Sequence, residues 1–140
     1  MRHVLCVFLM VGICLMLTAC GVGRNKPRTK TSDKNIRIID YSQLRALLDD
    51  PKLKPLLVDV RIHKAQFDAG HIPGAVHIPM PKLRASNKQI SEAKLIIIYS
   101  ADRLDSLSTA STKKLMRIGY KVMEYRGGFT DWQGQQGKGP

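Results

Sequence analysis

The chain has 140 residues, which is room for one domain, and 44% of them are hydrophobic, as is typical of globular proteins. Its charge is the outlier, because 23 lysines and arginines stand against 11 aspartates and glutamates, a formal net charge of +12. Such an excess favours anionic partners such as anionic lipid headgroups, nucleic acid or acidic protein faces, and it also serves plain solubility. Neither a basic helix interleaved with aromatic residues nor a zinc-finger or RNA-binding signature is present, so we expect no nucleic-acid partner.

The first twenty residues have the layout of a bacterial secretory signal. A short basic start precedes an almost wholly apolar run from Val4 to Leu17, and all three cysteines of the chain lie in this segment. The run ends in Leu-Thr-Ala-Cys at residues 17–20, which resembles a lipobox, in which the cysteine sulfur takes a diacylglycerol and the chain is cleaved before it. We therefore expect a lipoprotein signal peptide over residues 1–19 and a lipidated Cys20, carrying acyl chains such as palmitate.

An uncleaved membrane-spanning helix is the alternative, because the apolar run approaches the ~20 residues that a span needs. Five basic residues come after the run and before residue 36, and only Arg2 precedes it, which argues against export of the C-terminal side of the chain. The lipobox is more specific than this charge count, so it takes precedence. Gly21, in place of an aspartate after the cysteine, favours the outer membrane, with the protein facing the periplasm.

The mature chain is expected to begin with a basic, flexible tether over residues 20–35, which has too few apolar side chains to form a core. A single folded domain is predicted over 36–136, with a tail over 137–140. In chain order we expect a strand over 36–39, a helix between Asp40 and Pro51, a strand over 56–60, a helix over 63–69, a strand over 75–78, a loosely helical stretch up to Ser91, a strand over 95–99, a helix ended by Gly119, a strand over 121–125 and a short helix after Gly128.

The element signals together predict an α/β fold. Asp40 and Gln43 form a capping box for the first helix. Residues 56–60 and 95–99 are continuous apolar runs, of the kind that parallel strands buried on both faces carry. The helix that ends at Gly119 is expected to turn its apolar side chains inward: Leu107, Ala110, Leu115 and Ile118. Alternating strands and helices indicate a mostly parallel sheet with helices on both faces.

Two series of motifs resemble those of the rhodanese-like domain family over roughly residues 36–133. The first comprises Asp59-Val60-Arg61, Phe67, the run Gly-His-Ile-Pro-Gly-Ala at 70–75, and Ile78-Pro79. The second comprises the strand Ile96 to Tyr99, the loop after it, Gly119-Tyr120, Gly127-Gly128 and Trp132. The resemblance implies a five-stranded, mostly parallel sheet, with the active site in the loop after the fourth strand.

Some of these motif residues are expected to be structural. Asp59 and Arg61 at a strand end should fix neighbouring loops through an ion pair or backbone contacts. His71 lies in a turn bounded by glycines and is expected to be a hydrogen-bonding histidine, and Trp132 is expected to fill the core.

The loop after the fourth strand departs from the family pattern. Active members begin this loop with a nucleophilic cysteine whose pKa is lowered by the loop amides and a helix N-terminus. A common form is Cys-x-x-Gly-x-Arg-Ser, and here the same seven positions run from Ser100 to Ser106. Ser100 replaces the thiol, Arg103 replaces the glycine, and Asp105 replaces the arginine. The Asp105 carboxylate is expected to cap the next helix and so occupy the amides that an anionic substrate would use.

The altered loop predicts a catalytically inactive member, a pseudoenzyme without catalytic residues. The loop positions concerned are Ser100, Ala101, Asp102, Arg103, Leu104 and Asp105. The predicted role is a binding or structural module at the cell envelope, with an envelope protein as partner. The alternatives are an unusual sulfur- or phosphoryl-transfer enzyme, and a sensor that binds a small anion through Arg61 and Arg103.

Other chemistries have weaker signals. A serine hydrolase would need a base near Ser100, and the sequence places none of the histidines there. No cluster of His, Asp or Glu has metal-ligand spacing, so neither a metal nor a cofactor is expected.

Overall fold

The computed structural model describes residues 33–136. The predicted signal peptide, Cys20, most of the tether and the tail from 137 to 140 lie outside these residues. The last three positions assigned to the tether form a short 3-10 turn, η1 (Asp33–Asn35). Within the described part of the chain, no helix has the length and apolarity needed to cross a membrane.

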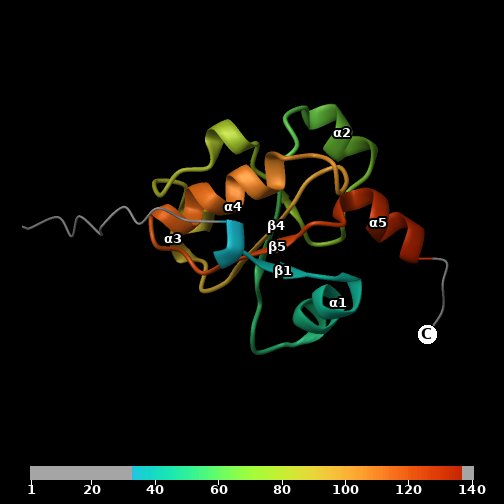
Figure 1. Cartoon of the computed structure of the whole chain (residues 1–140), viewed down its shortest axis with the longest axis horizontal. Coiled ribbons are helices and arrows are strands. Elements are labelled where there is room, and N and C mark those ends of the chain that lie inside the picture. Colours follow the sequence, from blue (N-terminus) through green and yellow to red (C-terminus); the bar gives the residue numbers. More distant parts are fainter. Residues whose placement is uncertain (1–32, 137–140) are drawn as a thin grey trace, which may run out of the picture.

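A five-stranded, all-parallel sheet forms the centre of the domain (Figure 1). The strands are β1 (Arg37–Ile39), β2 (Leu56–Asp59), β3 (Val76–His77), β4 (Ile96–Tyr99) and β5 (Val122–Tyr125). Their order is β1-β5-β4-β2-β3, so β4 lies in the middle, between β2 and β5. Register places Asp59 beside Tyr99, which brings the carboxyl ends of β2 and β4 to the same level. The predicted fold class is confirmed.

Helices cover both faces of this sheet. The helices are α1 (Tyr41–Asp49), α2 (Lys64–Ala69), α3 (Lys88–Glu92), α4 (Leu107–Arg117) and α5 (Gly128–Gln135), together with a 3-10 turn η2 (Met80–Lys82). The helices α1 and α5 contact each other on one face, whereas α4 and η2 contact each other on the opposite face. Figure 1 shows α1 and α4 on opposite sides of the strands.

Local sequence signals account for several helix ends. The Asp40 side chain accepts a hydrogen bond from the Gln43 amide at 2.8 Å, and the Gln43 side chain accepts one from the Asp40 amide at 3.1 Å. This is the predicted capping box. The Gln43 amide bond, followed by a bond from the Ser42 hydroxyl, lowers the pKa of Asp40. Beyond the end of α4, Gly119 has a φ of 89°, which a residue with a side chain adopts only with strain.

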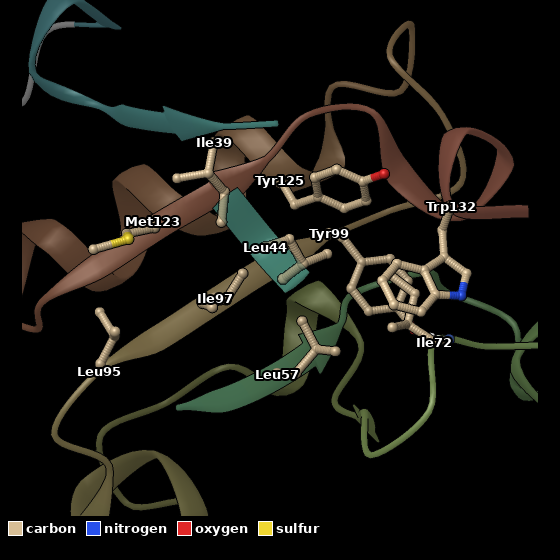
Figure 2. Packing of buried hydrophobic residues seen from close by; sticks show 10 residues of the cluster. All are labelled: Ile39, Leu44, Leu57, Ile72, Leu95, Ile97, Tyr99, Met123, Tyr125 and Trp132. Carbon is tan, nitrogen blue, oxygen red and sulfur yellow. Dashed lines mark hydrogen bonds between the residues drawn. The ribbon is translucent and has the colours of Figure 1, made fainter. Parts of the chain in front are cut away.

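Two hydrophobic clusters fill the space between the sheet and its helices. The cluster under α1 and α5 consists of Ile39, Leu44, Leu57, Ile72, Leu95, Ile97, Tyr99, Met123, Tyr125 and Trp132. Figure 2 shows Trp132, Tyr99 and Ile72 gathered at one end of it. Trp132 is 3% exposed, as expected for a residue that fills the core. The second cluster, under α3 and α4, consists of Val58, Val60, Ile78, Leu83, Ile90, Ile96, Ile98, Leu115 and Val122.

The inner side of α4 differs from the prediction. Leu115 is buried, but the prediction that Ile118 faces the core is wrong, since Ile118 is 41% exposed. The reason is that α4 ends at Arg117, so Ile118 no longer follows the helical spiral. The other buried residues of this helix are small and polar: Ser108, Ser111 and Thr112.

Candidate functional site

The loop of residues 100–106 joins β4 to α4 at the carboxyl edge of the sheet. Ligands of open α/β sheets bind at this edge. Ser100, the first residue of the loop, is fully buried, and its hydroxyl donates a hydrogen bond to Oδ2 of Asp105. The loop therefore holds its serine side chain inward against a carboxylate of the same loop.

Two carboxylates of the loop occupy its own backbone amides. Oδ1 of Asp105 accepts from the Leu107 amide at 2.9 Å, so the expected carboxylate is bound to the first amide of α4, although Ser106 and not Asp105 holds the N-cap position. Oδ1 of Asp102 accepts from the amides of Leu104 at 2.8 Å and Asp105 at 3.1 Å. The role of Asp102 was not foreseen from the sequence. An aspartate that binds the amide two residues later is a common turn signal, and it is present here at both positions.

The start of α5 fixes the other side of the loop. The amides of Phe129 and Thr130 donate to the carbonyls of Ser100 and Ala101, both at 2.9 Å. Gly128 has a φ of 70°, and a Cβ at this position would lie 2.7 Å from the Asp102 amide nitrogen. It would also lie 2.8 Å from the carbonyl carbon and oxygen of Ala101. The glycine is therefore required by both its backbone conformation and this close approach.

Arg103 and Leu104 are the outward residues of the loop. Leu104 is 93% exposed. Arg103 lines a cavity of about 320 Å³ with Ile38, Asp40 and Arg126, and a second cavity of about 280 Å³ with Asp102, Gly127 and Asp131. The lining of the first cavity thus contains two arginines beside one exposed carboxylate.

Asp59 and Arg61 form a buried ion pair at the end of β2. Nη2 of Arg61 lies 2.6 Å from Oδ2 of Asp59, and the side chains of Arg61 and Asp59 are 7% and 0% exposed respectively. The same nitrogen donates to the Gly70 carbonyl at 2.7 Å, and the guanidinium carbon lies 5.0 Å from the centroid of the Phe129 ring. The predicted structural pair is confirmed. Arg61 lines neither of the two cavities beside Arg103.

The histidines of the described residues lie between the end of β2 and the end of β3. Nδ1 of His71 is 3.0 Å from the Phe67 carbonyl, and the His71 ring stacks on the Phe67 ring at 3.9 Å. This confirms the expected hydrogen-bonding role of His71. Nε2 of His77 is 2.8 Å from the Arg61 carbonyl, and His63 precedes α2. The Ser100 hydroxyl thus donates to a carboxylate and not to a histidine.

Two buried tyrosines are held by groups around the site. The Tyr99 hydroxyl accepts from the Ile72 amide at 3.2 Å, and burial, followed by the charge of Asp59, raises the pKa of Tyr99. The Tyr125 hydroxyl donates to Oδ2 of Asp131 at 2.6 Å, and burial, followed by this bond, raises the pKa of Tyr125. Both phenols remain neutral at physiological pH.

Glu124 was expected only as a member of the strand over 121–125, and the structure buries it fully. It accepts from the hydroxyls of Ser108 and Thr109 at 2.8 and 2.7 Å, and Arg126 lies 2.9 Å from its other oxygen. A glutamate within a buried strand, followed two residues later by an arginine, is the signal that predicts such a pair. Among residues 33–136, no three His, Cys, Asp or Glu side chains group as metal ligands.

Comparisons with known proteins bear on the whole domain. Residues 40–135 match the rhodanese-like domain family. The chain is 30% identical over 107 residues to an adenylyltransferase and sulfurtransferase of Meyerozyma guilliermondii, covering 71% of this chain and 24% of that protein. It is 32% identical over 83 residues to the protein YqhL of Bacillus subtilis, covering 59% of this chain and 64% of YqhL. The aligned segments thus span less than two thirds of either relative.

The fold likeness extends to solved structures. A crystal structure of a Bacillus halodurans protein matches with a TM-score of 0.64 and 28% sequence identity, over 73% of this chain and 74% of that one. A rhodanese-like domain protein of Staphylococcus aureus matches with a TM-score of 0.60 at 24% identity, covering 69% of this chain and 91% of that protein, and shows the fold alone.

Proposed function

This chain belongs to the rhodanese-like domain family, which includes sulfurtransferases, and on that premise we propose that it is a member without sulfurtransferase activity. It serves instead as a binding or structural module at the bacterial cell envelope, tethered to the membrane through Cys20. Its partner in this role is an envelope protein.

The single observation that carries the proposal is the bond between Ser100 and Asp105. In the family pattern Ser100 occupies the nucleophile position, and sulfur transfer requires a thiolate there. The Ser100 hydroxyl is fully buried against the Asp105 carboxylate, out of reach of a substrate, and a serine does not carry a sulfane sulfur. Asp105 also places a negative charge where thiosulfate, a dianion, would have to bind.

The hydrogen bonds of the loop support the same conclusion. Amides that would cradle an anionic substrate donate to the carboxylates of Asp102 and Asp105. A substrate would have to displace these side chains. Because they belong to the same loop as the amides, their effective concentration at the amides is high. The loop therefore stabilises itself in place of a bound anion.

A small-anion sensor is the second candidate, and the 320 Å³ cavity beside Arg103 and Arg126 favours it. An arginine pair suits a carboxylate or phosphate. Sulfate, phosphate or thiosulfate at constant ionic strength should raise the Tm of a sensor. An unchanged Tm would exclude it and leave the binding or structural module.

The activity test is a thiosulfate:cyanide sulfurtransferase assay on the whole protein. Wild type should show only a background rate. This background includes any contribution from the cysteines of the leader. Ser100→Cys should give a reactive thiol with little turnover, because Asp105 raises the pKa of that thiol and repels thiosulfate. Adding Asp105→Arg and Arg103→Gly should raise turnover about tenfold or more over the single variant, since the three groups act together.

A matched variant separates a reactive thiol from a restored site. Ser106→Cys places a cysteine at the exposed far end of the same loop and should react with thiol reagents without supporting turnover. Sulfurtransferase activity of wild type above the background would refute the proposal. A triple variant as inactive as Ser100→Cys would show that the loop backbone no longer accommodates the reaction.

The envelope location has its own test. Wild type should incorporate labelled palmitate and lose residues 1–19, and fractionation should place it in the outer membrane. Cys20→Ser should remain unlabelled and unprocessed, whereas Cys14→Ser should behave as wild type, because several acyl chains on Cys20 give stable anchoring. A mature mass that includes the leader and no lipid would contradict the anchor.

A further inference from the structure

One side of α4 carries a series of basic and hydroxyl side chains. Ser106, Thr109, Lys113, Lys114 and Arg117 line a cleft of about 420 Å³, together with Met80 of η2. Their spacing of three and four residues places them on one side of the helix, over its whole length. We call this set the α4 stripe. Figure 1 shows α4 on the side of the sheet away from α1.

The charge of the α4 stripe is positive. Its lining contains three cations and no carboxylate. Nζ of Lys114 donates to the Met80 carbonyl at 3.1 Å, a neutral group that orients the ammonium without cancelling its charge. Thr109 donates to Glu124, but that carboxylate is fully buried and already paired with Arg126. Lys114 and the exposed Arg117 therefore give the cleft a positive charge.

The side chains of the α4 stripe suit a phosphate group. An exposed arginine offers a planar fork of donors, lysines offer point charges, and Ser106 adds an exposed hydroxyl. The cavity of about 280 Å³ beside the loop has two carboxylates, those of Asp102 and Asp131, and one arginine in its lining, so it is less positive than the α4 stripe.

We propose that the α4 stripe docks the domain onto the phosphate headgroups of an anionic lipid surface. The inference rests on the proposed membrane anchor and assigns the face of the domain that meets the membrane. Only residues 21–32 separate Cys20 from Asp33, so the domain lies within about 45 Å of the bilayer even with that segment fully extended. At such a range weak electrostatic contacts suffice, because the tether raises their effective concentration.

The test is lysine acylation of the full chain in two kinds of vesicle, one of phosphatidylcholine and one with a third of it replaced by phosphatidylglycerol. At low salt, the acylation rates of Lys113 and Lys114 should fall severalfold on the anionic vesicles only. Lys52 and Lys54, exposed in the segment after α1, serve as internal controls and should react equally on both. Raising the salt to about 1 M should abolish the protection, because screening then acts within about 3 Å.

A charge reversal identifies the residues responsible. Arg117→Glu removes one cation and adds an anion, and since each basic residue near an anionic surface strengthens binding about fivefold, docking should weaken about thirtyfold. Lys52→Glu makes the same change of charge after α1 and should leave the protection intact. Both residues are exposed, so neither variant is expected to unfold the protein.

Equal acylation on both vesicles, protection of Lys52 and Lys54 to the same degree, or protection that survives the high salt would each overturn the assignment. Protection of Lys113 and Lys114 that requires an added envelope extract would assign the α4 stripe to an acidic protein and overturn the lipid docking. These outcomes are independent of the sulfurtransferase and palmitate assays, which test the proposed function itself.

Discussion

The carboxyl ends of β2 and β4 use the same local device with opposite results. At each end, an aspartate side chain accepts a hydrogen bond from the amide two residues later. After β2, Asp59 accepts from Arg61. After β4, Asp102 accepts from Leu104, and Asp105 accepts from Leu107. After β2 the carboxylate is neutralised by a buried guanidinium. After β4 the donors shown by these bonds are neutral, namely amides and the Ser100 hydroxyl.

The comparison shows that the same kind of turn can have two different roles. The charges of Asp59 and Arg61 neutralise each other, and Arg61 also donates to the Gly70 carbonyl, so the pair is structural. The loop of residues 100–106 retains a frame of amides but fills it with its own carboxylates. Under the proposed function, these carboxylates take the place of a ligand anion, whereas the charge of Asp59 is neutralised within its own turn.

The largest effect should come from breaking the ion pair after β2. Arg61→Met keeps most of the side-chain volume but leaves the Asp59 carboxylate buried without its cation, so the free energy of unfolding should fall by about 3–5 kcal/mol. Urea denaturation measures this loss. Lys64→Met, which breaks the exposed pair with Asp68, should cost less than about 1 kcal/mol. Equal losses in the two variants would show that burial does not distinguish the pairs.

The contact of α5 with the loop after β4 should rank second. Gly128→Ala introduces a Cβ into backbone at 2.7–2.8 Å and forces alanine to a φ of 70°, and it should lower the free energy of unfolding by about 2–4 kcal/mol. Gly134→Ala is the matched control, since its Cβ would meet nothing within 4 Å inside the same helix. That change should stabilise by about 0.5–1 kcal/mol. Thermal unfolding of both variants compares them, and a tolerated Gly128→Ala would mean that α5 does not hold the loop.

Tyr99 connects the two regions, because its hydroxyl at the end of β4 accepts a hydrogen bond from the Ile72 amide. Tyr99→Phe should cost about 1–3 kcal/mol at neutral pH by leaving that buried amide without an acceptor. Since the folded pKa of Tyr99 is raised, its stabilisation is complete below the unfolded pKa near 10 and is lost as pH rises further. Wild type should therefore lose up to about 1.4 kcal/mol more per pH unit above about pH 10 than Tyr99→Phe. Denaturation at several alkaline pH values measures the two slopes, and identical slopes would contradict the raised pKa.

The smallest change in stability should come from the loop carboxylates themselves. Asp105→Ala should cost about 1 kcal/mol, as for a lost helix cap. Together with Asp102→Ala it should free the amides, so sulfate at about ten times its Kd should then stabilise the double variant by about 1.4 kcal/mol. Asp50→Ala removes a comparable turn bond, to the Lys52 amide, away from the loop and should gain no response to sulfate. A sulfate response in wild type equal to that of the double variant would show that the carboxylates do not block the loop.

Much of the sheet was predictable because its central strands have a distinctive composition. Leu56 to Asp59 and Ile96 to Tyr99 are apolar runs of a kind that only burial on both faces explains. The capping box at Asp40 was equally direct, since it depends on residues three positions apart. Asp105 was foreseen as a cap for the same reason: the bond is local, and the helix start beside it was predicted.

The features that the sequence did not indicate depend on contacts between distant segments. Glu124 is buried because Ser108 and Thr109 of α4 reach it, and no local pattern reveals that meeting. The inner side of α4 is made of small polar residues, which hydrophobic periodicity cannot detect. Ile118 was misplaced because the periodicity extends through it, whereas the helix ends one residue earlier.

The pairing of β1 with β5 has a consequence for how the chain acquires its structure. Ile38 lies beside Glu124, so the first strand made during synthesis finds its neighbour only near the end of translation. The inner strands β2 and β4 pair across a much shorter stretch of chain and can associate earlier. Parallel pairings between remote segments slow folding, because a large loop must close before any contact is gained. The edge strand β1 is therefore expected to join last, and hydrogen exchange during refolding should show its amides protected after those of β4.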